Sequence, residues 1–189
     1  KEGKIRVSYD GSVGIQTLYK QMDVLSGDEY MTYLNEKARV NDQPAVFTPE
    51  QIAANVWNTN WQDEIFRSAV ITNHAVDISG GGPTFKGSLG LSYFDQDGIV
   101  KKGGYERISI RTNLEYNISK YVSASANIIF SRSNHDQMNS QGGSRGTTVI
   151  NSALTASPLA TPHYDDGSWN DFQTQPTAGM NPVAYLHEV

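Results

Sequence analysis

Two groups of side chains in this sequence have types and spacings suited to binding a ligand. The first lies in Pro162–Pro176, a stretch rich in Pro, Gly and Asp, where Tyr164 and Trp169 accompany Asp165 and Asp166. A flat aromatic ring with carboxylates beside it suits the apolar face and the hydroxyl groups of a sugar ring. We therefore take Tyr164, Asp165 and Trp169 as candidate ligand-binding residues in a loop.

The second group is charged and periodic. Arg107, Arg111 and Glu115 recur at every fourth position, so in a β-strand they project from one face. One interpretation is a polar wall that forms salt bridges and hydrogen bonds with neighbouring protein, and the other is a path for a polar substrate. We favour the wall, because a polar β surface carries many such residues and few of them touch a ligand.

The sequence offers no catalytic or metal-binding constellation. Asp95-Gln96-Asp97-Gly98 resembles the opening of a calcium loop, and Glu106 falls near the position of the closing bidentate ligand, but Lys101 and Lys102 intervene. We interpret this stretch as a turn. The histidines have no i, i+4 pair, and no nucleophile elbow or phosphate loop occurs. We therefore expect no catalytic residue, no metal, no other cofactor and no enzymatic activity. The scattered histidines are His74, His135, His163 and His187.

Composition narrows the class of protein further. The 189 residues carry 15 Lys and Arg against 20 Asp and Glu, a formal charge of −5 that argues against nucleic acid as a partner. Cysteine is absent, which excludes disulfides and thiol chemistry. No apolar run approaches the roughly 18 residues of a transmembrane helix. A membrane remains open, because transmembrane β-strands leave only an alternating pattern. The start at Lys1, with no signal-peptide core after it, fits a mature terminus or an internal piece.

Strict alternation of apolar and polar residues is the dominant pattern. In the clearest segment, Ile108 to Ile118, apolar residues and Thr112 alternate with Arg, Ser, Asn and Glu. Side chains of a strand point alternately to opposite faces, so each such segment predicts a strand with one wet and one apolar face. The sequence thus predicts an all-β fold of antiparallel strands with helical loop insertions. The expected strands lie near 4–15, 70–80, 85–94, 106–118 and 122–133.

The connections are unequal in length, and aromatic residues gather near strand ends. Short turns are expected after the second and fourth strands, and long loops at 16–69, 95–105 and 134–189. Transmembrane β-barrels have short turns at one end, long loops at the other, and an aromatic girdle at each interface. A soluble β-sandwich also alternates, so it remains the alternative. The aromatics assigned to the two levels are Phe85, Tyr116 and Tyr121 at the short-turn ends, and Tyr93, Phe94, Tyr105 and Phe130 at the long-loop ends.

The long loops contain local structure of their own. Ser26-Gly27-Asp28-Glu29 and Thr48-Pro49-Glu50-Gln51 are capping boxes, each of which predicts the start of a helix. We expect Trp57 and Trp61 to pack this helical loop together. Residues 134–189 are expected to form a loop that leads to a further strand at Ala184-Tyr185-Leu186.

Several stretches resemble the start of the barrel in the SusC/RagA family of TonB-linked (TonB-dependent) outer-membrane transporters. They are Trp61-Gln62-Asp63-Glu64-Ile65-Phe66-Arg67, Ile78-Ser79-Gly80-Gly81 and Leu91-Ser92-Tyr93-Phe94-Asp95-Gln96-Asp97-Gly98-Ile99. The Lys4–Gly14 strand is similar to the one that follows the plug in that family, and Leu25–Tyr30 fits its first extracellular loop. The resemblance covers roughly residues 1–135 and is looser from Gln137 onward.

The resemblance implies that this chain is the first part of a large transmembrane β-barrel, of the 22-stranded plugged type. Signal peptide, N-terminal extension, plug and remaining barrel are expected to be absent from it. Five strands cannot close a barrel, since the smallest have about eight. The implied function is import of oligosaccharides, or less often peptides, across the bacterial outer membrane. The implied partners are a SusD-like surface lipoprotein, the TonB complex acting through the plug, the cargo, and outer-membrane lipid.

Two other functions stay open at this level. One is a soluble, secreted β-sandwich that binds glycans, and the other is a passive porin-type barrel. A sandwich is expected to close its sheet within the chain, and a glycan-cleaving enzyme needs two carboxylates about 5–9 Å apart on rigid elements. Asp165 and Asp166 are adjacent in one loop, which does not fit that requirement.

Overall fold

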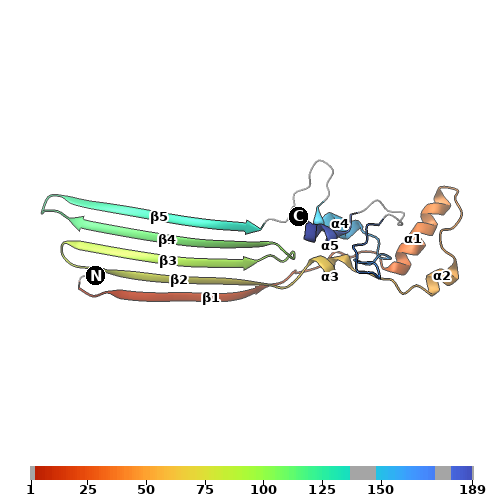
Figure 1. The fold of residues 1–189 in the computed structure, drawn as a ribbon, viewed down its shortest axis with the longest axis horizontal. Helices are drawn as coiled ribbons and strands as arrows, with labels where there is room; N and C mark the ends of the chain where they lie inside the picture. The colour runs from red at the N-terminus through yellow and green to blue at the C-terminus, as the bar shows by residue number, and fades with distance from the viewer. Residues whose placement is uncertain (1–2, 137–147, 173–179, 189) are drawn as a thin grey trace. The chain divides into compact units, whose positions relative to one another are not determined.

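The structure, a computed structural model, describes residues 3–136, 148–172 and 180–188. The chain divides into two compact units, and Figure 1 labels their elements. The first, here called the strand unit, contains residues 1–17 and 68–137. The second, the loop unit, contains residues 18–67 and 138–189. Each unit has its own architecture.

The strand unit is a single sheet of five antiparallel strands in the order β1-β2-β3-β4-β5. The expectation of an antiparallel all-β fold with helical insertions is confirmed, and every strand overlaps its expected range. The strands are β1 Arg6–Gln16, β2 Ala69–Gly81, β3 Phe85–Asp97, β4 Gly104–Asn117 and β5 Ser123–Asp136.

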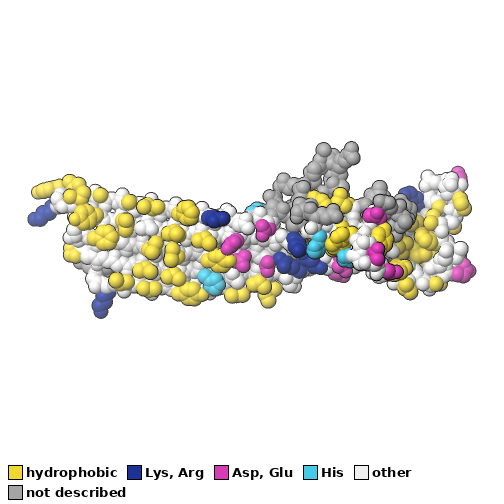
Figure 2. All heavy atoms as spheres, viewed as in Figure 1, with side chains coloured by type: hydrophobic (Ala, Val, Ile, Leu, Met, Phe, Trp, Pro, Cys, Tyr) yellow, Lys and Arg dark blue, Asp and Glu magenta, His cyan; other side chains and the backbone are white. Residues whose placement is uncertain are grey.

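The register places the alternating residues of all five strands on two chemically different faces. Residues that pair across antiparallel strands share a face, and rows such as Val76, Leu91, Ile110 and Phe130 run across the sheet. Figure 2 shows hydrophobic side chains spread along the strands on the face in view. The apolar face includes Val7, Tyr9, Val13, Ile15, Val70, Val76, Ile78, Phe85, Leu89, Leu91, Tyr93, Ile108, Ile110, Leu114, Tyr116, Ile128 and Phe130.

This apolar face is open. Ile15 is 74% exposed, Val13 72% and Ile128 59%, whereas a sandwich or a soluble sheet would bury such side chains against a second layer. The opposite face carries Ser, Asn, Gln and charged residues. The described part of the chain therefore forms a two-sided sheet rather than a closed sandwich.

Short connections join consecutive strands at both ends of the sheet. After β2, the Gly82 amide donates to the Phe85 carbonyl at 2.6 Å, and a side chain at Gly81 would meet the backbone of Phe85. The β3–β4 connection is only residues 98–103, shorter than the expected loop at 95–105. The Gly98 amide donates to the Gly103 carbonyl at 2.8 Å. The pairing of β3 with β4 therefore extends as far as Asp97 and Gly104, inside the expected loop.

The assignment of aromatic residues to the long-loop girdle is wrong for two of its four members. Tyr93 and Phe130 lie on the apolar face, but Phe94 pairs with Arg107, and Tyr105 pairs with His135, on the polar face. The reason is parity, because adjacent residues of a strand point to opposite faces. Position near a strand end places an aromatic residue at the right height, but it does not determine which face of the sheet carries the ring.

The loop unit is built from short helices. The two expected capping boxes are present, with the Ser26 and Thr48 hydroxyls each accepting the backbone amide of the Glu29 or Gln51 three residues on. Within the described residues, no helix is long and apolar enough to cross a membrane. The helices are α1 Gly27–Val40, α2 Pro49–Ala53, α3 Trp61–Ile65, α4 Val149–Thr155 and α5 Pro182–Glu188.

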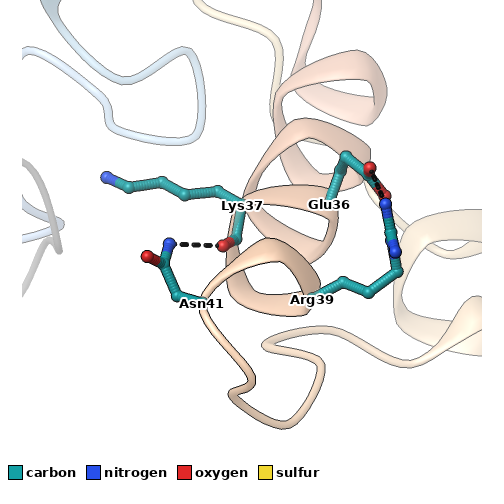
Figure 3. Close-up of polar contacts among 4 residues, drawn as sticks. All are labelled: Glu36, Lys37, Arg39 and Asn41. Atoms are coloured by element: carbon teal, nitrogen blue, oxygen red, sulfur yellow. Dashed lines mark hydrogen bonds and ion pairs between the residues drawn. The ribbon is translucent and has the colours of Figure 1, made fainter.

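The first helix, α1, buries one side and caps its exposed end. Met31, Leu34 and Ala38 are buried along it, as their helical spacing predicts. Figure 3 shows the C-terminal end, where Nε and Nη2 of Arg39 donate to the Glu36 carboxylate and the Asn41 side chain donates to the Lys37 carbonyl.

The strand expected at Ala184–Leu186 is wrong, since these residues lie in α5. The Asn181 side chain accepts the amides of Val183 and Ala184 at 3.0 and 3.2 Å. Pro182 occupies the first helical position, where a missing N–H costs nothing. An Asn followed by Pro indicates the start of a helix. This signal is stronger than the indication of a strand from the three residues Ala184-Tyr185-Leu186.

The core of the loop unit joins segments that are distant in sequence. Trp61, Ile65, Val149 and Phe172 are all at most 4% exposed, and the Trp61 and Phe172 rings meet edge to face at 5.5 Å between centroids. Trp61 is buried as expected, but the ring that it meets belongs to Phe172, outside the helical loop that it is expected to pack together. The expected packing role is wrong for Trp57, which is 52% exposed.

Candidate functional site

The three charged residues expected to form a polar wall do lie on the polar face of β4. The Arg107 guanidinium carbon lies 5.8 Å from the centre of the Phe94 ring, a cation–π distance. The Glu115 carboxylate lies 3.8 Å from the Lys86 ammonium on β3, and both side chains are 47% exposed. Arg111 pairs with Gly90 in the register. Exposed pairs of this kind contribute little stability, so they act mainly to give the face its polarity.

Polar ladders continue this wall across neighbouring strands. The Asn113 amide donates to the Ser88 hydroxyl at 3.0 Å, and the Ser109 and Ser131 hydroxyls lie 3.1 Å apart. These hydrogen bonds between neighbouring strands give the polar side chains partners on the same face of the sheet. The result is a mainly hydrophilic surface on one side of the sheet.

An aromatic group interrupts the polar face near the ends of β3, β4 and β5. The Phe94 and Tyr105 rings meet at 5.9 Å, and Tyr105 meets His135 at 5.8 Å, both edge to face. The sequence reasoning missed this group. The signal was available, because Tyr105 and His135 have the same parity as Arg107 and Ser133, their neighbours on the polar face.

The candidate ligand-binding residues Tyr164 and Asp165 lie in an exposed turn of the loop unit. The Tyr164 amide donates to the Ser168 carbonyl at 2.9 Å, and the Gly167 amide donates back to the Tyr164 carbonyl at 2.9 Å. Gly167 has a φ of 82°, which favours glycine. The Asp166 carboxylate accepts both the amide and the hydroxyl of Ser168, at 2.9 and 2.6 Å. Asp166 therefore shapes the turn, while Asp165 is exposed.

Two acidic side chains set the protonation behaviour of this turn. The Tyr164 hydroxyl donates to the Asp171 carboxylate at 2.7 Å, and this hydrogen bond raises the pKa of the phenol. The hydrogen bonds from Ser168 lower the pKa of Asp166. At neutral pH the turn thus presents a protonated Tyr164 phenol and an ionised Asp166 carboxylate.

Trp169, the third candidate, is engaged with two imidazole rings. It stacks on His163 at 4.1 Å between centroids with an interplanar angle of 27°, and lies 5.1 Å from His187. His163 and Trp169 also form an isolated β-bridge. The structure therefore brings Tyr164 and Trp169 to the two sides of one small hairpin, with part of the indole surface already covered by protein.

All four histidines lie against aromatic rings, a pattern that spacing along the sequence did not predict. His74 accepts or donates a 2.7 Å hydrogen bond with the Tyr9 hydroxyl on the apolar face, and its ring stacks on the Tyr9 ring. Across the described residues no three His, Asp or Glu side chains gather in a way that could hold a metal ion. Asp95 and Asp97 lie in β3, where they pair with Glu106 and Gly104 of β4.

The sequence of the chain is similar to those of known TonB-dependent receptors. No family model matches the chain. It is 40% identical over 110 residues to the TonB-dependent receptor SusC of Bacteroides thetaiotaomicron, covering 57% of the chain and 10% of that receptor. It is 30% identical over 161 residues to TonB-dependent receptor P3 of Formosa agariphila, covering 84% of the chain and 15% of that receptor.

The chain is a SusC/RagA-like barrel segment. Its fold matches that of one chain in the structure of the RagAB peptide importer in the closed-closed state, with a TM-score of 0.70, at 17% identity, over 97% of this chain and 24% of that chain. TonB-dependent receptor P26 of Formosa agariphila is 27% identical over 97% of the chain. The SusC/RagA-like segment spans only about a tenth to a fifth of the curated relatives it matches.

Proposed function

We propose that this segment belongs to an outer-membrane transporter that imports oligosaccharides or peptides. The observation that carries the proposal is the two-faced sheet: an exposed apolar face on one side and a polar wall on the other, in a sequence that is SusC-like. Transmembrane barrels need this arrangement, with apolar residues against lipid and a polar interior. A soluble sheet would be penalised for leaving its apolar face in water.

In this proposal the apolar face contacts outer-membrane lipid, and the polar face lines the barrel interior. Arg107, Arg111 and Glu115 then form a hydrophilic wall against which a plug packs. A SusD-like lipoprotein caps the extracellular side, and the TonB complex supplies energy through the plug. Support for such partners comes from the similarity to TonB-dependent receptors and to the RagAB peptide importer. The cycle binds and releases cargo without a catalytic residue or cofactor.

Cargo contacts are assigned to the exposed turn of the loop unit. Tyr164 and Asp165 offer a phenol and a carboxylate at its tip, and Trp169 supplies an indole from the other side of the same hairpin. These groups can hydrogen-bond to sugar hydroxyls or to peptide amides while an apolar ring face packs against the cargo. Asp171 orients the phenol through its hydrogen bond with Tyr164.

The test is made on the full-length parent protein in its native cells. Expected results are its recovery in the outer-membrane fraction, co-purification of a surface lipoprotein after detergent extraction, and loss of labelled oligosaccharide or peptide uptake when its gene is deleted. Tyr164→Ala with Asp165→Asn should reduce uptake without changing protein abundance, whereas Asp42→Asn, a loop change outside the turn, should not. Recovery of the parent in the soluble fraction would contradict the proposal.

The soluble glycan-binding sandwich is not favoured by the structure. Among the described residues, all five strands belong to one sheet, so there is no second sheet for it to pack on. A sandwich core needs two inner faces about 10 Å apart.

A further inference from the structure

The loop unit contains a groove that none of the roles above uses. Its volume is about 520 Å³, and its walls come from the segment before α1, the first turn of α1, the start of α3 and the end of α4. Among its lining residues are Asp23, Leu25, Glu29, Tyr30, Leu154 and Pro158. Because the groove lies within the loop unit alone, its shape depends on one compact body.

The charges at this groove are negative. Asp23 and Glu29 supply two carboxylates, and hydrogen bonds from the Ser26 amide and hydroxyl lower the pKa of Glu29, which keeps it ionised. Lys20 reaches Asp23 at 3.6 Å, but both side chains are highly exposed, so a ligand can displace this weak pair.

The net charge of the whole loop unit is also negative. Its sequence contains five Lys and Arg against twelve Asp and Glu, a formal charge of −7, whereas the strand unit has ten against eight, or +2. A unit with such a field raises the local concentration of cations and repels anions. Charge complementarity therefore favours a cationic occupant.

Apolar walls accompany the negative groups. Leu25 is 45% exposed, and Leu154 and Pro158 line the same groove. The hydroxyl of Tyr30, another wall residue, is buried without a hydrogen-bond partner. Buried polar groups are nearly always paired in native proteins, so a small rotation of this phenol toward a bound group would satisfy it. Trp61 offers no open ring face for a sugar, being 2% exposed and bonded to Ser157.

We propose that this groove binds the side chain of a Lys or Arg residue in a peptide cargo. The methylene stem would lie along Leu25, Leu154 and Pro158, as such stems do on apolar surfaces. The cationic head would reach Asp23 and Glu29, and Tyr30 would hydrogen-bond to the peptide. This inference rests on the proposed transport function and narrows its cargo to peptides with a basic residue.

The experiment uses the full-length parent protein in detergent, with its co-purifying partner retained. The probes are two labelled peptides, Gly-Ala-Lys-Ala-Gly amide and the same peptide with norleucine in place of Lys, titrated by fluorescence anisotropy. We expect the norleucine peptide to bind about tenfold more weakly, the value for losing one hydrogen bond to a charged group. Raising the salt concentration should weaken only the Lys peptide.

Matched variants assign the effect to this groove. Asp23→Asn should weaken the Lys peptide about threefold, as expected for an exposed charge contact, and leave the norleucine peptide unchanged. Asp42→Asn removes the same charge from a loop of the same unit outside the groove, and should change neither. Leu25→Arg places a guanidinium at the groove and should block the Lys peptide more strongly than Asp23→Asn.

Equal binding of the two peptides would overturn the inference, as would a loss in Asp42→Asn equal to that in Asp23→Asn. Loss of the co-purifying lipoprotein in Leu25→Arg, with peptide binding intact, would also overturn it, because the occupant would then be a partner side chain. These results differ from a failure of the proposed function, which would appear as a soluble parent protein or unchanged uptake after gene deletion.

Discussion

The indole nitrogen of Trp61 donates a 2.9 Å hydrogen bond to the carbonyl of Ser157, 96 residues further along the chain. Both residues are almost completely buried, at 2% and 1% exposure. Beside this bond the Thr59 amide donates to the Pro158 carbonyl at 2.8 Å. The two halves of the loop unit, separated in sequence by four strands, are therefore joined by a buried polar contact surrounded by apolar packing.

Replacing Trp61 by Phe should loosen this junction. The Ser157 carbonyl would lose its donor while buried, at a cost of about 1–3 kcal/mol in local stability. Hydrogen–deuterium exchange of residues 149–160 in the full-length protein should accelerate accordingly. Trp57→Phe is the matched control, since Trp57 is half exposed, and equal acceleration in both variants would contradict this account.

Gly27 should not tolerate a side chain. A Cβ at this position would collide with the carbonyl oxygen of Trp57 and crowd the Asn55 side chain, and the Gly27 amide donates to Asn58 at 3.0 Å. Gly27→Ala should therefore destabilise α1 by about 1–3 kcal/mol, although alanine is the better helix former. Protease cleavage between 27 and 58 should become faster, while Gly82→Ala, which meets no atom within 4 Å, should have no such effect.

The capping box of α1 should show a characteristic pH dependence. Hydrogen bonds from Ser26 lower the pKa of Glu29, so the folded state favours the ionised carboxylate. The resulting stability is present above the ordinary pKa of Glu and is lost as the pH falls through the lowered value. Carbon NMR of labelled Glu should show that Ser26→Ala moves the Glu29 midpoint upward and removes about 1 kcal/mol of helix stability. An unchanged midpoint would rule out the hydrogen bonds as its cause.

The turn that carries Tyr164 should weaken at high pH. The hydrogen bond to Asp171 raises the pKa of the phenol, so the contribution is present below the ordinary pKa of Tyr and lost as the pH rises through the raised value. The tyrosinate absorbance difference between the unchanged protein and Tyr164→Phe should isolate a phenol that ionises late, and Asp171→Asn should bring its midpoint down. A difference curve with no late transition would contradict this account.

Much of the strand unit follows from its sequence alone. The alternation from Ile108 to Ile118 identifies a strand and separates its two faces without knowledge of any neighbour, because the period of two is a property of the extended backbone. The same local logic gives the capping boxes at Ser26 and Thr48, since each involves contacts only three residues apart. Alternation along the strands also assigns Phe94 and Tyr105 to the polar face, because residue parity alone determines the face.

Only the tertiary structure decided what depends on residues distant in sequence. The pairing of Trp61 with Ser157, the contact of Trp169 with His187, and the groove beside Tyr30 each require the loop unit to fold back on itself. Nothing in a local pattern specifies which buried surfaces meet, because apolar packing is non-directional and selects partners by shape. The sequence determined which face of each strand is polar, and the folded chain determined which side chains stand next to one another on it.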